Sequence, residues 1–136
     1  ELRRLLVLQW ELKRTCMMSV VSALPPMPRV TFVLHAILGL DLERIAAICD
    51  TTADAVRVAW TRASHHVEDY LGARCQHVDA ANFCRCGTRL GVALEHGFIR
   101  YPEHADELPD TPVAGATHRD VVALYAALPA VLRPAD

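Results

Sequence analysis

Apolar residues recur every three or four positions along most of this chain, a spacing typical of amphipathic helices. One such segment runs from Leu42 to Cys49, and another runs from Val56 to Leu71. Residues 50–52 separate the two segments with a short polar break, whose threonine hydroxyls can cap the helix that follows. Two helices joined by so tight a turn predict a helix-turn-helix.

The second helix of this pair carries two opposite stripes of side chains. The inner stripe is apolar and consists of Val56, Trp60, Ala63, Val67 and Leu71. The outer stripe is mainly polar or cationic and consists of Asp54, Arg57, Val58, Thr61, Arg62 and His65. An exposed stripe of this kind beside a packed partner helix fits the major groove of DNA. Nucleic-acid recognition is therefore the leading hypothesis for function.

Two further helices are predicted ahead of this pair. Residues 1–24 form one long helix that ends before Pro25, because the residue preceding a proline avoids helical backbone angles. Its apolar stripe consists of Leu2, Leu5, Leu6, Leu12, Cys16, Val20 and Leu24. Burial of this helix against the rest of the chain is favoured over a docking surface for polymerase or an inhibitory partner. The next helix covers residues 29–38 and is capped by Gly39; its packing residues are Val30, Val33, Leu34 and Ile37.

The chain beyond residue 71 is less regular. Gly72 opens a cysteine-containing loop, and a short helix over residues 85–95 is stopped by Gly97. Residues 101–116 are polar and contain prolines, which predicts a linker. Thr117 and Asp120 resemble a capping pair that opens a last helix, with an apolar stripe of Val121, Leu124, Tyr125 and Leu128. This helix is too short to be stable alone, so we expect it to dock on the chain itself.

The segment from Leu24 to Leu71 also carries a family pattern. Its residues are Leu24-Pro25, Arg29-Val30, Phe32 and Leu34, followed by Gly39-Leu40-Asp41, Glu43, Ile45-Ala46, Thr52, Val56-Arg57 and Arg62-Ala63. This pattern resembles region 4, the promoter-recognition region of bacterial extracytoplasmic-function sigma factors, over about a third of the chain. Residues 72–94 place a Cys-x8-Cys-x-Cys spacing before Arg89-Leu90, which is similar to the tail of some such factors.

The resemblance implies an all-α fold: a sigma region 4-like helix-turn-helix bundle without a wing, followed by a C-terminal helical extension. It implies a DNA-binding transcription initiation factor that reads the −35 promoter element while docked on the RNA polymerase core. By position, Arg57 and Arg62 would contact phosphates, and Val58 and Thr61 would read bases. Thr52, Ala53 and Asp54 would lie at the helix entrance. His35 stands where the family commonly has arginine, so the resemblance also places it among the DNA-contacting residues.

Four segments follow from this interpretation. Residues 1–24 would link the reading domain to a missing upstream domain that melts the −10 element, since the chain opens on Glu1 and nothing in it resembles that domain. Residues 25–71 are the helix-turn-helix. Residues 72–100 hold the cysteine loop and a short helix, and residues 101–136 form an acidic linker and the last helix.

Charge qualifies the way in which this domain can bind DNA. Residues 30–71 hold three arginines and six carboxylates, a net charge of −3. Phosphate neutralisation supplies most non-specific DNA affinity, so weak binding is expected alone and useful binding only within the polymerase holoenzyme. The alternative is a helix-turn-helix kept for protein contacts. Residues 101–136 carry a net charge of −4, so DNA should repel them and we expect them to meet a protein or remain solvated.

Five cysteines in a chain without a recognisable secretion signal predict reduced thiols and a cytoplasmic, nucleoid-associated protein. Cys16 and Cys49 lie on apolar stripes, so packing is their expected role. Two ligand-x-ligand pairs stand apart, namely Cys75, His77, Cys84 and Cys86. Three sulfurs and one imidazole could hold zinc, with His96 or His104 as a substitute ligand; the alternative is a loop with buried thiols. A disulfide between Cys84 and Cys86 is not expected.

Other classes of function have little support in the sequence. No Gly-rich phosphate loop, nucleophile elbow or HExxH motif occurs, so no enzyme is predicted. No run of 18 uncharged apolar residues occurs, so no membrane partner is predicted. Two alternatives use the same fold differently. One is a metal- or redox-responsive regulator, and the other is a module whose residues 101–136 bind an anti-sigma or activator protein.

Overall fold

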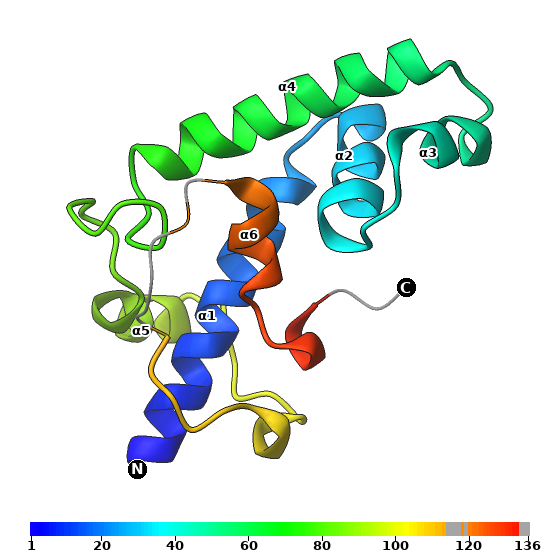
Figure 1. Cartoon of the computed structure of the whole chain (residues 1–136). Helices are drawn as coiled ribbons and strands as arrows, with labels where there is room; N and C mark the ends of the chain where they lie inside the picture. The colour runs from blue at the N-terminus through cyan, green and yellow to red at the C-terminus, as the bar shows by residue number, and fades with distance from the viewer. Residues whose placement is uncertain (114–117, 119, 134–136) are drawn as a thin grey trace.

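The computed structural model describes residues 1–113, 118 and 120–133, and within them it contains helices and no strand (Figure 1). The all-α prediction is therefore confirmed. The α-helices are α1 (Leu2–Ser22), α2 (Pro26–Phe32), α3 (Leu42–Ile48), α4 (Ala53–Gly72), α5 (Cys86–Glu95) and α6 (Val121–Ala126). Shorter helical turns are η1 (Val33–Ile37), η2 (Ala105–Glu107) and η3 (Ala130–Leu132). No helix of the described ranges is both long enough and apolar enough to cross a membrane.

Helix α1 contributes residues to three apolar clusters, so its predicted burial against the rest of the chain is confirmed. The predicted stripe was only partly correct, because Leu2 is 71% exposed and Leu5 is 45% exposed. Other side chains of α1, including Val7, Leu8 and Met17, are buried. The reason is that apolar clusters cover α1 from more than one side, whereas a single stripe assumes one covered face.

The largest cluster joins α1 to α2, α4 and α6. It contains Met17, Val20 and Val21 of α1, Phe32 of α2, Val67 and Leu71 of α4, and Leu124 and Tyr125 of α6. The Tyr125 hydroxyl donates a hydrogen bond to the Met17 carbonyl oxygen at 2.7 Å. All four stripe residues of the last helix are buried, so the prediction that this helix docks on its own chain is confirmed. Asp120 caps α6 by accepting from the Ala123 N–H, while Thr117 lies outside the described residues.

Residues 101–113, expected to belong to a polar linker, contribute to a second cluster instead. Ala105, Leu108 and Val113 are buried against α1 together with Leu132. Trp10 of α1 belongs to this cluster and donates from its Nε1 to the Thr111 carbonyl oxygen at 2.9 Å. The apolar side of the C-terminal segment is therefore occupied within the chain, which leaves less of it for an outside partner.

A third cluster fixes α5 against α1. Leu8 and Leu12 pack on Leu90, Ala93 and Ile99. Helix α5 ends as predicted at Gly97, which has a φ of +67°, a conformation that glycine adopts at little cost. The Phe98 N–H bonds the Ala93 carbonyl oxygen at 2.9 Å and closes the helix.

The helix predicted over residues 29–38 differs from the one observed. Helix α2 begins earlier, at Pro26, because proline is accommodated in the first helical turn, where its missing N–H would have no partner. The last turn, η1, widens to a π-helix, with the Leu38 N–H bonding the Val33 carbonyl oxygen at 3.0 Å. Gly39 ends it with a φ of +74°. Among the predicted packing residues, Val30 is exposed.

Candidate nucleic-acid interface and cysteine pocket

The connection between α3 and α4 is built from local hydrogen bonds. The Asp41 carboxylate caps α3 by accepting from the Arg44 N–H at 2.7 Å. Asp50 takes the left-handed conformation with a φ of +51°, which aspartate adopts more readily than most residues other than glycine. The Thr51 N–H then bonds the Ala46 carbonyl oxygen at 3.0 Å, which closes α3. The chain therefore turns sharply within four residues.

Helix α4 begins immediately after this turn. The Thr52 hydroxyl accepts a hydrogen bond from the Ala55 N–H at 3.1 Å, so Thr52 is the N-cap. A small apolar cluster of Ile45, Ala46 and Val56 packs α3 against the start of α4. Met27 and Leu34 contact the same cluster. The first half of α4 is thus held mainly by α3, which directly precedes it, together with Met27 and Leu34 from earlier in the chain.

The two predicted stripes of α4 lie where the sequence placed them. Four of the five inner residues are buried, and Trp60 is half-buried. The outer residues Asp54, Arg57, Val58, Thr61, Arg62 and His65 are all exposed. Val58, the apolar member of the outer stripe, is 51% exposed. Figure 1 shows α4 as a long helix along one edge of the molecule, with α2 and α3 beside its first half.

The two arginines of the outer stripe have different surroundings. Arg57 forms an ion pair with Asp54, at 2.6 Å between Nη1 and Oδ1. Its Nη2 also lies 3.9 Å from Oε1 of Glu43 on α3. Across residues 1–113, 118 and 120–133, no carboxylate forms an ion pair with Arg62. The positive charge of Arg57 is therefore already balanced, whereas that of Arg62 faces solvent.

The remaining predicted DNA-contacting residues are not all on this face. The His35 Nδ1 lies 2.7 Å from the Leu40 carbonyl oxygen, and its ring packs edge-on against Trp60 at 4.5 Å. Trp60 also stacks on Phe32 at 5.7 Å. His35 thus packs between η1 and α4, away from the outer stripe. At the start of α4, Thr52 is exposed and Ala53 is half-buried.

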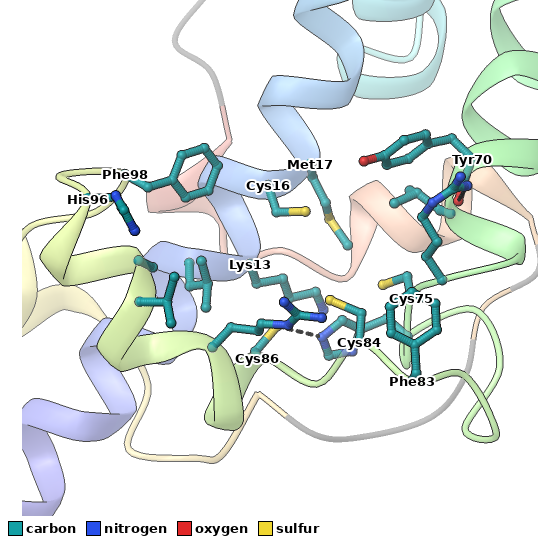
Figure 2. A pocket seen from close by; sticks show the side chains of 17 residues that line it. Lys13, Cys16, Met17, Tyr70, Cys75, Phe83, Cys84, Cys86, His96 and Phe98 are labelled. Carbon is teal, nitrogen blue, oxygen red and sulfur yellow. Dashed lines mark hydrogen bonds between the residues drawn. The ribbon is translucent and has the colours of Figure 1, made fainter.

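A second site lies where α4 ends. A pocket of about 500 Å³ is bounded by α1, the loop after α4, and α5 (Figure 2). All four predicted metal ligands line it, namely Cys75, His77, Cys84 and Cys86. Cys16 of α1, which the sequence assigned to core packing, lines the same pocket, as does Lys13. The spacing of these two residues, three positions apart on one helix face, could have indicated that they share a surface.

The loop between α4 and α5 is held by backbone pairing around two of these cysteines. Cys75 and Cys84 form an isolated parallel bridge. The Gln76 N–H bonds the Cys84 carbonyl oxygen at 3.1 Å, and the Cys84 N–H bonds the Arg74 carbonyl oxygen at 3.0 Å. The Asn82 side-chain amide donates to the Gly72 and Cys75 carbonyl oxygens. These bonds bring the two ligand pairs together although six residues lie between His77 and Cys84.

The side chains in the pocket make fewer hydrogen bonds to one another than the backbone of the loop does. The His77 Nε2 lies 3.5 Å from the Cys86 Sγ, and the His77 side chain is buried. His96 lines the pocket beside Phe98, far from Cys75 in Figure 2. His104 lies elsewhere, with its Nε2 3.8 Å from Glu11. Among the residues described, no three Cys, His, Asp or Glu side chains already converge as a group that could hold a metal ion.

Burial shifts the pKa values of several titratable side chains that line the pocket. It raises the pKa of Cys86 to about 12 and that of Cys16 to about 11, and the neighbouring thiols raise both further. Burial likewise lowers the pKa of His77 to about 4, helped by the nearby positive charge of Lys13. The pKa of the Lys13 ammonium is also lowered by burial. At neutral pH Cys16 and Cys86 are therefore protonated thiols, and His77 is a neutral imidazole.

No protein-family model, curated protein or solved structure matches this chain. Within the described residues, two surfaces are candidates for function: the outer stripe of α4 and the cysteine pocket.

Proposed function

We propose that this chain is a DNA-reading domain that recognises the −35 promoter element through the outer stripe of α4 while docked on the RNA polymerase core. In this proposal α4 enters the major groove and α3 packs across its N-terminal half. Arg62 and Arg57 contact phosphates, whereas Val58 and Thr61 face base edges. His35 is left out of the contact set, because its ring is engaged by Leu40 and Trp60.

The single observation that supports this proposal most is the exposure of the outer stripe. Its six residues span three turns of one capped helix, and each of them is open to solvent. Val58 and Thr61 lie three positions apart, so they occupy the same face between Arg57 and Arg62. A branched apolar side chain and a hydroxyl are both groups that read base edges, the apolar one through the thymine methyl.

Electrostatics supports weak binding by the domain alone. The pairing of Arg57 with Asp54 and Glu43 must be broken or shared before a phosphate gains from its charge. Exposed pairs of this kind are worth about 0.2–1 kcal/mol, so the exchange is feasible but gains little. Tethering to polymerase removes the need for strong intrinsic affinity, since it raises the local concentration to roughly the millimolar range for a short linker.

The test is selection of duplexes from a randomised pool by the full chain, with and without RNA polymerase core. We expect enrichment of one short motif only when the core enzyme is present. Arg62→Ala should weaken binding to all sequences and reduce the slope of log affinity against log salt by about one, because one phosphate contact is lost. Val58→Ala and Thr61→Ala should change the selected motif, because base contacts specify sequence.

Arg100→Ala is the matched control, because Arg100 is an exposed arginine after α5, remote in sequence from the stripe. It should leave the affinity, the salt slope and the motif unchanged. A motif that survives Val58→Ala combined with Thr61→Ala would overturn the assignment of α4 as the reading helix. Enrichment that needs no polymerase core would overturn the tethered mechanism.

A further inference from the structure

The loop after α4 concentrates four metal-ligand side chains within twelve residues, at the wall of a pocket that also holds a buried lysine. We propose that Cys75, His77, Cys84 and Cys86 bind one Zn²⁺ ion in a tetrahedral site whose negative charge is balanced by Lys13. This site goes beyond the reading of DNA and does not depend on it, because none of its residues lies on the outer stripe of α4.

The distance between His77 and Cys86 fits a shared metal ion. Zinc binds cysteine sulfur at about 2.3 Å and histidine nitrogen at about 2.0–2.1 Å, so tetrahedral ligands of these two kinds lie roughly 3.5 Å apart. The Cys86 Sγ and the His77 Nε2 are 3.5 Å apart.

The backbone brings the other two sulfurs to the same place. The parallel bridge makes Cys75 and Cys84 direct neighbours across two chain segments. Arg85 is extended, with a φ of −118° and a ψ of 128°, and residues that flank an extended residue project to the same side. Cys84 therefore shares a side with Cys86. Figure 2 shows the labelled side chains of Cys75, Cys84 and Cys86 facing one region of the pocket.

Closing the site requires side-chain rotation. In the part of the chain described, three donors do not yet meet at one point, so the thiols must turn about their Cα–Cβ bonds when the ion enters. Cys75, Cys84 and Cys86 are half-buried free thiols, so none of them is committed to a disulfide.

The net charge of the metal centre favours a ligand set of three sulfurs and one imidazole over a set of four sulfurs. Three thiolates, a neutral imidazole and Zn²⁺ sum to a single negative charge. Lys13 is 4% exposed and lines the pocket, and no carboxylate of residues 1–113, 118 or 120–133 pairs with it. A buried ammonium is costly without an opposite charge, so the centre and Lys13 neutralise one another. A fourth thiolate from Cys16 would leave one charge unbalanced.

The experiment uses the full chain, reduced and stripped of metal, titrated with Co²⁺ as a spectroscopic substitute for zinc. We expect the intense visible bands of tetrahedral thiolate-bound Co²⁺ to saturate at about one equivalent, and Zn²⁺ to abolish them. Cys86→Ser and His77→Ala should each weaken Co²⁺ binding by at least about tenfold. Lys13→Met should weaken it in the same direction, because the charge of the centre is then unbalanced.

Two cysteines supply matched controls. Cys49 lies at the end of α3 and packs with another cluster, so Cys49→Ser should bind Co²⁺ as the unchanged chain does. Cys16→Ser should do the same, although Cys16 lines the pocket. A measurement without substitutions guards against misfolded variants: Zn²⁺ should protect Cys75, Cys84 and Cys86 from a thiol reagent and leave the labelling of Cys49 unchanged.

Three results would overturn the proposal. Co²⁺ titration that gives no thiolate bands removes the site. Binding lost in Cys16→Ser but kept in His77→Ala replaces the proposed ligand set. Equal labelling of all five cysteines with and without Zn²⁺ also removes the site. Each result is independent of duplex selection, so failure of the zinc site leaves the DNA-reading proposal untouched, and the reverse also holds.

Discussion

The two halves of α4 are held by different kinds of contact. The first half packs on a small cluster formed by residues close in sequence, Ile45, Ala46 and Val56, and its other face is exposed. The second half is embedded in the largest cluster, which brings together α1, α2 and α6. The difference shows how a helix that is weakly packed in one half can still present a defined surface. The second half supplies the rigidity, and the first half extends from it with its outer stripe uncovered.

Truncating the side chain at the centre of the large cluster should cause the largest loss of stability. Tyr125 is the largest of the fully buried side chains, and Tyr125→Ala should lower the free energy of unfolding by about 3–5 kcal/mol. Tyr125→Phe removes only the hydrogen bond to the Met17 carbonyl oxygen and should cost about 1 kcal/mol. Urea denaturation followed by circular dichroism measures both. A loss below about 1 kcal/mol for Tyr125→Ala would contradict the docking of α6.

A matched pair on α4 itself compares the two halves directly. Val67 and Val56 are both 0% exposed, one in each half. Each change to alanine removes two methyl groups, worth about 1.6 kcal/mol by transfer. Val67→Ala should cost more, about 2–3 kcal/mol, because the large cluster cannot collapse around the space that is left. Val56→Ala should stay near the transfer value, since several partly exposed neighbours can close in. Equal losses would mean that both halves are packed alike.

A smaller effect tests the local hydrogen bonds that begin α4. Thr52→Ala removes the N-cap and should lower the free energy of unfolding by about 1 kcal/mol. Thr51 is exposed one residue earlier and forms no such cap, so Thr51→Ala is the control and should have little effect. Hydrogen exchange of the first-turn amides of α4 gives a second readout. The same loss for both substitutions would show that Thr52 is not the cap.

The same difference between local and distant contacts explains what could be predicted from sequence. The stripes of α4 and the cap at Thr52 depend on residues within a few positions of one another, and both were predicted. Cys16 beside the loop cysteines, and Leu108 against α1, depend on segments about sixty to one hundred residues apart. A single sequence does not predict such long-range contacts, because many apolar stripes could pack against one another equally well.

His35 illustrates the limit within the region that was predicted best. Family position placed it among the DNA contacts, yet its ring bonds to the Leu40 carbonyl oxygen and packs on Trp60. The widened turn of η1, which was not predicted, and the predicted cap at Gly39 together bring that carbonyl within reach. A resemblance gives the position of a residue along the chain, whereas the local backbone decides which way its side chain is directed.

The two tryptophans are distributed so that each belongs to a different part of the molecule. Trp10 is bonded to the C-terminal segment through Thr111, and Trp60 lies on α4 between Phe32 and His35. Replacing either one with phenylalanine leaves a single indole as an intrinsic fluorophore. Emission from Trp10 then reports detachment of the C-terminal segment, and emission from Trp60 reports loosening of α4 from η1. Comparing the two variants during unfolding gives the order in which these regions separate, without any added label.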